Sequence, residues 1–203
     1  MRSYDINQLT NKQRYKLLTG LITPRPIALV TSISSNGTIN AAPFSYFNII
    51  SSTPPTIVLG INRVKGEIKD TARNILDNRE FVVHKIDEAI LENANQTSAS
   101  LPYGQSEIDL TSFTLIDSQK IKTPAIKQAA VRMEVILKDH LTLENEGTIT
   151  TDVILGTVVM LYAEEAIVDD NDYVDYDRYE VIGRLAGTKY ARLGKITSLD
   201  RPK

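Results

Sequence analysis

The sequence predicts a mainly β protein with peripheral helices, folded as an antiparallel barrel. Roughly six segments have the alternating or continuous apolar patterns of strands, and few stretches have a helical pattern. The spacing of the strand-like segments suits an antiparallel barrel better than alternating β-α-β units. The chain also lacks the glycine-rich motifs GxGxxG and GxxxxGKS/T, which argues against a dinucleotide-binding α/β fold and against a P-loop.

The N-terminal part of the chain, before the strand expected over 56–61, predicts one helix and a strand hairpin. The helix is expected to be capped by Thr10 or Asn11, to run through residue 18 and to end at Gly20. An apolar, β-rich run over 27–34 predicts the first strand. Asn36-Gly37 then predicts a hairpin turn, because both central positions of that turn need a positive φ.

Further elements alternate between strands and helices before the pattern becomes irregular. The expected order is a strand over 56–61, a helix over 68–78, a strand over 80–86 and a helix from Asp87 through Ala94. Residues 95–130 have no regular pattern, and we interpret them as an insertion that covers part of the barrel. Two long strands follow over 131–143 and 153–163, and Asn145-Glu146-Gly147 forms the turn between them.

Composition narrows the possible partners and location. With 203 residues, 42% of them apolar and 24% charged, the chain is expected to form a single domain over 1–203. A net charge of −2 provides no electrostatic footprint for nucleic acid or for an anionic membrane, so neither is an expected partner. The N-terminus lacks the apolar region of a signal peptide, and a cytoplasmic location is expected.

The sequence contains no cysteine, and His84 and His140 are its only histidines. This composition excludes a catalytic thiol and thiolate ligation of iron–sulfur clusters, and it offers little for a histidine-based metal site or catalytic triad. No metal site and no catalytic side chain are predicted. Any redox chemistry therefore requires a bound organic cofactor. We expect His84 to be a hydrogen-bonded barrel residue and His140 to be solvated.

Residues 40–46, Asn-Ala-Ala-Pro-Phe-Ser-Tyr, form the first candidate site. They combine side chains too small to fill a core with polar groups that a core disfavours. Such a surface allows backbone and hydroxyl groups to approach a flat, polar, ring-shaped ligand closely. We interpret it as a shelf for a flavin.

Lys69-Asp70-Thr71, at the start of the helix expected over 68–78, forms the second candidate site. Free backbone N–H groups and the positive end of the helix dipole favour an anion there, and Arg63 and Lys65 add positive charge. Together these groups suit a phosphate monoester. In the alternative interpretation, Asp70 or Thr71 only caps the helix and the cations are solvated.

Several fragments, in the right order over nearly the whole chain, resemble the flavin reductase-like FMN-binding proteins with a split β-barrel, and their flavoredoxin-like branch most of all. The fragments are PRPIALVTS, NAAPFSYFN, SSTPP, KDTARNI, EFVV, LPYGQSEIDL, VILGTVVML and YEVIGRLAGTKYARLG. The resemblance implies a split antiparallel barrel that binds FMN. It also implies a homodimer with the flavin near the subunit interface.

The resemblance also implies positions for the flavin contacts. Thr31 and Ser32 would contact the ribityl chain or the ring edge. The other implied contacts are the ring-facing backbone of Asn40, Ala41 and Ala42, with N–H groups aimed near N5; the shelf of Ser45, Tyr46, Phe47 and Asn48; the phosphate-binding helix start of Lys69, Asp70 and Thr71; and a C-terminal tail with Tyr190 and Arg192.

Two departures from the family pattern affect the electron donor. The branch that uses NADH usually has a histidine just before the late long strand, where this chain has Thr150, Thr151 and Asp152. A related branch has a Glu-Cys pair where this chain has Glu134 and Val135. Flavin binding survives both changes, whereas direct use of a nicotinamide becomes an open question.

Three functions follow as hypotheses. The first is an NAD(P)H-dependent flavin reductase, with NADH or NADPH as co-substrate, that passes electrons to a small-molecule or protein acceptor. The alternative is a flavoredoxin-type FMN electron carrier without its own nicotinamide site. The third, a barrel that has lost its flavin, is disfavoured by the intact segments 40–48 and 69–71. Four cations are candidates to lie near the flavin ring: Lys69, Arg25, Arg184 and Arg192.

Overall fold

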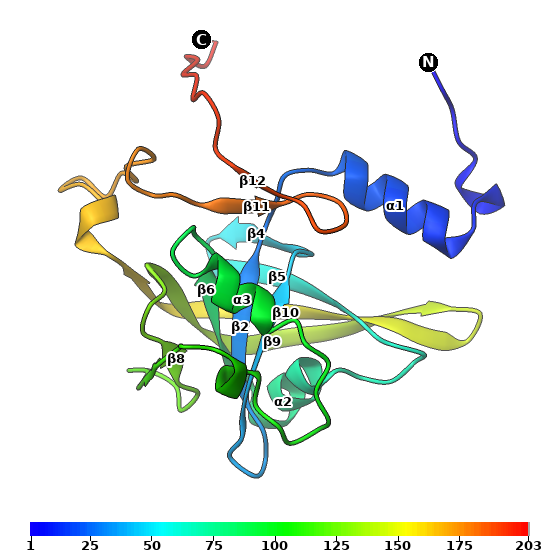
Figure 1. Cartoon of the computed structure of the whole chain (residues 1–203), viewed down its shortest axis with the longest axis horizontal. Coiled ribbons are helices and arrows are strands. Elements are labelled where there is room, and N and C mark those ends of the chain that lie inside the picture. The colour runs from blue at the N-terminus through cyan, green and yellow to red at the C-terminus, as the bar shows by residue number, and fades with distance from the viewer. Residues whose placement is uncertain (203) are drawn as a thin grey trace.

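Seven antiparallel strands form one curved sheet within residues 1–202, the part of the chain that the computed structural model describes (Figure 1). Their spatial order is β3 (Ile39–Phe44), β2 (Ala28–Ile33), β6 (Glu80–Lys85), β9 (Val131–Asn145), β10 (Thr148–Ala163), β5 (Pro55–Asn62) and β4 (Phe47–Ser52). Every pairing between neighbours in this sheet is antiparallel.

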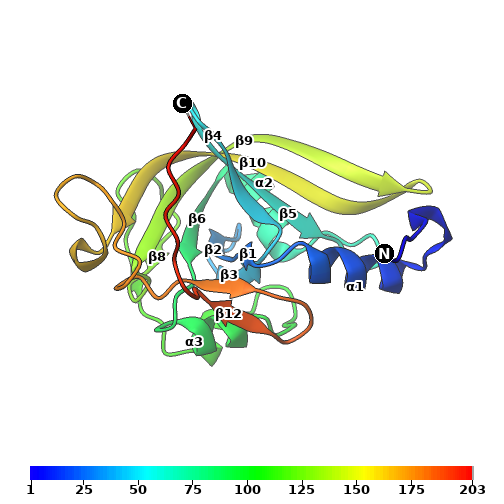
Figure 2. The same ribbon diagram turned by 90° about the horizontal axis from the view of Figure 1, so that it is seen from above.

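The connection between the two edge strands forces the sheet to close on itself. β3 and β4 lie at opposite ends of the sheet, yet only Ser45 and Tyr46 separate them in the chain. So short a link spans roughly 11 Å at most, and the two edges must therefore lie close together. Figure 2 shows the resulting curl. The prediction of a mainly β fold with a split antiparallel barrel is confirmed.

Two small sheets and three helices complete the structure. β1 (Arg25–Pro26), β11 (Ile182–Arg184) and β12 (Tyr190–Arg192) form one sheet, and β7 (Leu115–Ile116) pairs with β8 (Ala125–Ile126). The helices are α1 (Asn11–Leu21), α2 (Asp70–Asn78) and α3 (Leu91–Gln96), and short 3-10 turns lie at Ile6–Gln8, Glu107–Leu110 and Glu165–Ile167. No helix of the described residues is long and apolar enough to cross a bilayer.

Two apolar clusters explain why these elements pack together. Inside the curled sheet, Phe81 and Leu59 pack with Ala72 and Ile75 from the buried face of α2. A second cluster on the other side of β2 joins Leu29 to apolar residues of the segment 95–130. This segment therefore packs over the sheet next to β2 and β3. The prediction of a single domain over 1–203 stays a prediction.

Several predicted boundaries need correction. α1 passes through Gly20 and ends at Leu21, with Ile22 as its C-cap residue. Glycine does not set the stop; Pro24 follows closely and disfavours helical backbone at the residue before it. The cap at Thr10 is confirmed, with Gln13 completing a capping box. β10 begins at Thr148, five residues earlier than the start predicted at residue 153, because the turn is confined to Glu146-Gly147, both with positive φ. α3 starts at Leu91, and Asp87 instead accepts a hydrogen bond from Ile90 N.

Candidate functional site

A cleft of about 290 Å³ lies between the edge strand β3 and the N-terminal end of α2. β3 contributes Asn40 and Ala42 to its wall, and α2 and its cap contribute Lys69 and Thr71. Pro43 is tolerated in this strand because an edge strand can spare the N–H that proline lacks. The segment after α3 closes the cleft with Thr97, Ser98, Ala99, Ser100 and Leu101. Two segments singled out by the sequence therefore meet at one cleft.

A hydrogen bond between buried side chains joins the two walls. Asn40 Nδ2 donates to Thr71 Oγ1 over 2.9 Å, although the residues are 31 positions apart. Because Thr71 acts as the acceptor here, its own hydroxyl proton remains available for a ligand in the cleft. Both side chains are buried, with 6% of Asn40 and 2% of Thr71 exposed to solvent. The pair fixes the position of the helix start relative to β3.

The start of α2 has backbone N–H donors that no capping side chain accepts. Lys69 is the N-cap residue and makes no side-chain capping bond. The first backbone hydrogen bond of the helix runs from Arg73 N–H to Lys69 O. The N–H groups before Arg73 therefore have no acceptor within the helix. Asp70 pairs with Arg73 over 2.7 Å, and Thr71 bonds with Asn40. The part of the alternative in which Asp70 or Thr71 caps the helix is therefore wrong, whereas Lys65 and Lys69 are exposed to solvent, as the same alternative expected.

An acidic residue that the sequence analysis did not select lies in the same cleft. Glu107 lines the wall, and its Oε2 accepts the backbone N–H of Ala41 over 3.0 Å. Burial raises the pKa of Glu107, and the bond from Ala41 counteracts only part of that effect. The N–H of Ala41, which was expected to face the flavin, is thus engaged within the protein.

Thr31 and Ser32, expected at the ribityl chain or ring edge, lie inside the molecule. Both are fully buried on β2. Thr31 Oγ1 donates to Pro124 O over 2.8 Å, and Ser32 Oγ accepts from Asn74 Nδ2 over 3.2 Å. Neither residue lines the cleft. In this structure they support β3 and α2 from behind.

A second cavity of about 150 Å³ adjoins the cleft and collects three of the four candidate cations. Arg25, Lys69 and Arg184 line it, and Lys69 lines both cavities. Ser45 and Tyr46, two predicted shelf residues, lie in its wall. Burial raises the pKa of the Tyr46 hydroxyl, which favours its neutral, hydrogen-donating form. This cavity is therefore electropositive.

The remaining predicted residues lie elsewhere. Phe47 and Asn48 line an apolar cavity of about 610 Å³ between α1, β4, β5 and the β9–β10 hairpin. Tyr190 bonds to Asn95 Oδ1 over 3.1 Å, and Arg192 pairs with Glu88. Neither Tyr190 nor Arg192 lines the cleft or the electropositive cavity.

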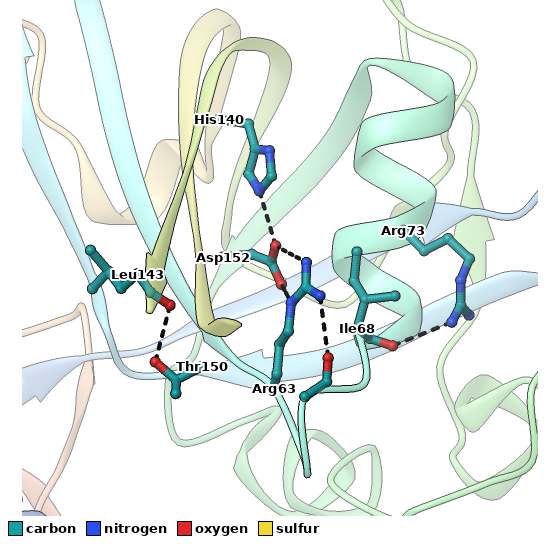
Figure 3. A network of polar contacts seen from close by, with 8 residues as sticks. Arg63, Ile68, Arg73, His140, Leu143, Thr150 and Asp152 are labelled. Carbon is teal, nitrogen blue, oxygen red and sulfur yellow. Dashed lines mark hydrogen bonds and ion pairs between the residues drawn. The ribbon is translucent and has the colours of Figure 1, made fainter. Parts of the chain in front are cut away.

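A buried ion pair supports the loop that leads into α2. Figure 3 shows Arg63 in the loop after β5, Asp152 on β10 and His140 on β9 pointing toward one another. Asp152 is fully buried and accepts two hydrogen bonds from Arg63, at 2.8 and 2.9 Å. Burial by itself would raise the pKa of Asp152, but the bonds from Arg63 and His140 hold it below its usual range. The same arginine donates to Gly66 O over 3.2 Å, which ties down the loop before Lys69.

His140 is the clearest error among the sequence expectations. It was expected to be solvated, but its Nε2 lies 3.0 Å from Asp152 Oδ1 and only 23% of its side chain is exposed. Two facing strands align the residues, since β9 and β10 pair throughout this region. Among residues 1–202, no group of three or more metal-ligating side chains lies close enough to hold a metal ion.

The family model for the flavin reductase like domain matches residues 20–182. YwrF of Bacillus subtilis, an uncharacterised protein, is 46% identical over 100% of both chains. The crystal structure of nitrilotriacetate monooxygenase component B from Bacillus cereus is 42% identical, covers 98% of each chain and has a TM-score of 0.95.

Two further structures extend the similarity. The 2-nitrobenzoate 2-nitroreductase NbaA of Pseudomonas fluorescens is 33% identical over 99% of this chain and 96% of its own, with a TM-score of 0.89. Flavoredoxin of Desulfovibrio vulgaris shares the fold, with a TM-score of 0.73 at 16% identity over 87% and 90% of the chains. By its family match and these relatives, the chain belongs to the flavin reductase like domain family.

Proposed function

We propose that the protein binds FMN in the cleft between β3 and α2 and uses it as an NAD(P)H-dependent flavin reductase. The observation that carries the proposal is the Asn40–Thr71 bond, which joins a strand of small residues to an open, positively charged helix start. The family supports the oxidoreductase class. The donor, the acceptor and the residues that hold the flavin belong to the proposal.

The residues at the helix start fit a phosphate group. Thr71 keeps a hydroxyl proton to donate, the first N–H groups of α2 have no helical acceptor, and Lys69 adds a positive charge. Glu107 stands on the opposite wall, with its carboxylate held on the Ala41 N–H. This acid fits neutral or hydrogen-donating parts of the ligand, such as hydroxyl groups, rather than the phosphate.

The remainder of the site fits a flat ring system. Ala42 and Pro43 line the cleft with small side chains, so a ring can approach the strand backbone closely. FMN supplies the hydride chemistry when it is bound, and the chain then needs no general acid or base of its own. Arg25 and Lys69 place positive charge beside this part of the strand, where it stabilises an anionic ring.

Relatives suggest two kinds of electron acceptor. The Bacillus cereus relative is component B of a nitrilotriacetate monooxygenase, and the Pseudomonas fluorescens relative is a nitroreductase. By analogy, this chain reduces flavin for a protein component or transfers electrons to a small molecule. The second candidate function is an FMN electron carrier. It is favoured by Asp152, which lies in the region where the NADH-using branch of the family usually has a histidine. Arg63 binds this carboxylate, so the position does not provide the side chain expected for use of NADH.

A homodimer in the cytoplasm is part of the same proposal. The apolar cavity lined by Phe47 and Asn48 is bordered by exposed apolar side chains, including Leu18, Ile22 and Leu143. An exposed apolar face of this kind is typical of a subunit interface. Ser45 and Tyr46 line this cavity as well as the electropositive one, so a second subunit there would lie next to the flavin site.

An anaerobic titration of the FMN-loaded protein with NADPH and then NADH tests the proposal, with the visible absorption of the flavin as the readout. Rapid bleaching by either nucleotide is the expected result and identifies the donor. A spectrum that neither nucleotide bleaches but dithionite does would support the carrier instead. Failure of the protein to take up FMN would contradict both functions.

A further inference from the structure

The electropositive cavity lies beside the cleft assigned to the flavin and shares only Pro43, Phe44 and Lys69 with its wall. It lies between α1, the β3–β4 link and the loop of the β11–β12 hairpin, which turns toward α1 in Figure 2. The contact between hairpin and helix is close, since a Cβ at Gly20 would lie 3.9 Å from the Cβ of Ala186. With about 150 Å³, the cavity is smaller than the roughly 300–1,000 Å³ of a site for a drug-sized ligand. It has room for one small group.

Arg25 contributes a buried positive charge to this cavity. Only 9% of the residue is exposed. Its guanidinium donates to the carbonyl oxygens of Thr19 at 2.6 Å and Ile22 at 2.8 Å, and further to Leu185 O and Ser45 Oγ. All of these acceptors are neutral, and no carboxylate pairs with Arg25 within the described residues. A buried cation without a counter-charge is costly, and an anionic ligand would offset that cost.

Arg184 contributes a donor that the protein does not use. Its Nη1 is buried and has no hydrogen-bond partner within the described part of the chain. The group is held in place from two sides, because Nη2 donates to Gly187 O and Cζ lies 4.3 Å from the centre of the Tyr190 ring. A buried N–H group without an acceptor is rare in native proteins, and its usual explanation is a missing ligand or water.

The sign of the charge in the wall is uniform. Arg25, Lys69 and Arg184 line the cavity, and none of its described lining residues is acidic. Tyr15 and Tyr46 add hydroxyl groups. Pro43, Phe44 and Lys69 belong to this wall and to the wall of the flavin cleft, so an anion held here is adjacent to the flavin.

We propose that this cavity binds a carboxylate or phosphate group of the second substrate, and so selects anionic electron donors or acceptors. The inference rests on the proposed flavin function, because the second substrate is defined by its exchange of electrons with the flavin. A planar guanidinium with a free N–H favours such oxyanions over neutral groups. The two possible sources are the phosphates of a nicotinamide nucleotide and the carboxylate of a small aromatic acceptor.

The test measures binding of benzoate and of inorganic phosphate to the full chain by calorimetry, with and without FMN. Arg184→Gln removes the unused donor, and Arg132→Gln is the matched control. Arg132 also stacks on a tyrosine, with Cζ 4.5 Å from the centre of the Tyr162 ring, but it does not line the cavity. Arg184→Gln should weaken anion binding roughly tenfold or more, because a hydrogen bond to a charged group is lost. Arg132→Gln should leave it unchanged, and FMN affinity should be unchanged in both variants.

Steady-state kinetics distinguish the two sources of the anion. If the cavity holds the phosphate of the donor, Arg184→Gln raises the KM for the nicotinamide nucleotide. If it holds the acceptor, the variant raises the KM for 2-nitrobenzoate instead. Arg184→Lys, which retains the charge, should restore part of the loss in either case.

Three results would overturn the proposal. One is a wild-type protein that binds neither benzoate nor phosphate at millimolar concentration, which needs no variant to interpret. Another is an FMN-loaded Arg184→Gln protein that binds both anions as the FMN-loaded control does, since FMN then occupies the phosphate site at the start of α2. The third is a loss of FMN affinity in Arg184→Gln, which would make the cavity part of the flavin site. Failure of the wild type to load FMN is a separate outcome and contradicts the proposed function itself, since anion binding is also measured without FMN.

Discussion

At the scale of single residues, His84 shows how one buried side chain connects distant parts of the fold. The imidazole is fully buried on β6. Its Nε2 accepts the backbone N–H of Ile126 over 2.8 Å, so the proton is on Nδ1, which donates to Leu29 O over 2.9 Å. The expectation of a hydrogen-bonded barrel histidine is confirmed. The ring connects β2 in the sheet with β8 in the covering segment.

The burial of His84 predicts a loss of stability in acid. Burial lowers its pKa from 6.5 to about 4, because the charged ring would lose its hydration. The unfolded chain therefore binds this proton below pH 6.5 and the folded chain only below about pH 4. The free energy of unfolding should fall as the pH decreases across that window, by roughly 3 kcal/mol in total.

Denaturant unfolding of wild type and His84→Gln between pH 7 and pH 4 measures this effect. The variant has no titratable group at this position, so its stability should decrease less steeply with falling pH. Other groups contribute equally to both proteins. Parallel curves for the two proteins would show that His84 does not titrate as described.

The cleft shows which of its residues the sequence could predict. Asn40 and Thr71 stood out because they lie in short segments whose composition is unusual for a core or a plain helix start. Glu107 did not stand out, because a single glutamate in an irregular segment is an ordinary surface residue. Its role depends on a bond to Ala41, 66 positions away, and no local pattern contains that information.

At the scale of the elements, the loop between β5 and α2 depends on a strand pair far away in the chain. Asp152 on β10 is fully buried and binds Arg63, which is 15% exposed and also holds Gly66 O. The loop carries Val64 and Lys69 into the wall of the cleft. The β9–β10 pair therefore positions the start of α2 from behind.

Asp152→Asn should loosen this loop. The change leaves a largely buried guanidinium without its counter-charge, which costs about 3 kcal/mol or more of unfolding free energy. It should also weaken FMN binding, because Lys69 loses its fixed position. Asp175→Asn is the control, since Asp175 pairs with Arg178 at an exposed site where ion pairs contribute little.

Denaturant unfolding and FMN titration check this prediction together. Similar stability and similar FMN affinity in the Asp152→Asn and Asp175→Asn proteins would contradict the described role of the buried pair.

The elements also show why local sequence patterns predicted the presence of strands better than the positions of the strand ends. Asn36-Gly37 predicted its turn correctly, since Gly37 has a φ of 87°, and the strand over 56–61 lies within β5. The strands predicted for β9 and β10 were too short because their outer residues are polar or partly exposed, apart from the buried Asp152, and such segments lack the apolar alternation of a strand. Their backbone bonds to each other extend the hairpin regardless of side-chain pattern.

At the scale of the whole molecule, the closed sheet leaves one apolar face open. Ile22 is 62% exposed and Leu143 is 55% exposed, beside a cavity of about 610 Å³ with Phe47 and Val153 in its wall. Exposing these side chains is unfavourable in a monomer. The face explains why we propose a homodimer.

Leu143→Glu should convert the proposed homodimer to a monomer, because the carboxylate would be buried in the proposed apolar interface without a partner. Sedimentation velocity gives the mass of wild type and variant. Leu199→Glu serves as the control, because Leu199 lies near the C-terminus and is 89% exposed. A monomeric wild type, or a variant that sediments as the wild type does, would contradict a dimer through this face.

The measurement that tests the central claim most directly is the FMN affinity of Lys69→Ala/Thr71→Ala, followed by the quenching of flavin fluorescence. The double variant removes one charge and one hydroxyl donor from the helix start, and each bond to a phosphate is worth about 1.5–3 kcal/mol. We predict that FMN binds the wild type and the exposed control Lys127→Ala alike, and binds the double variant at least roughly tenfold more weakly, with all three proteins folded. Equal affinity of the double variant and the wild type, or a wild type that does not bind FMN, would contradict the assignment of the cleft.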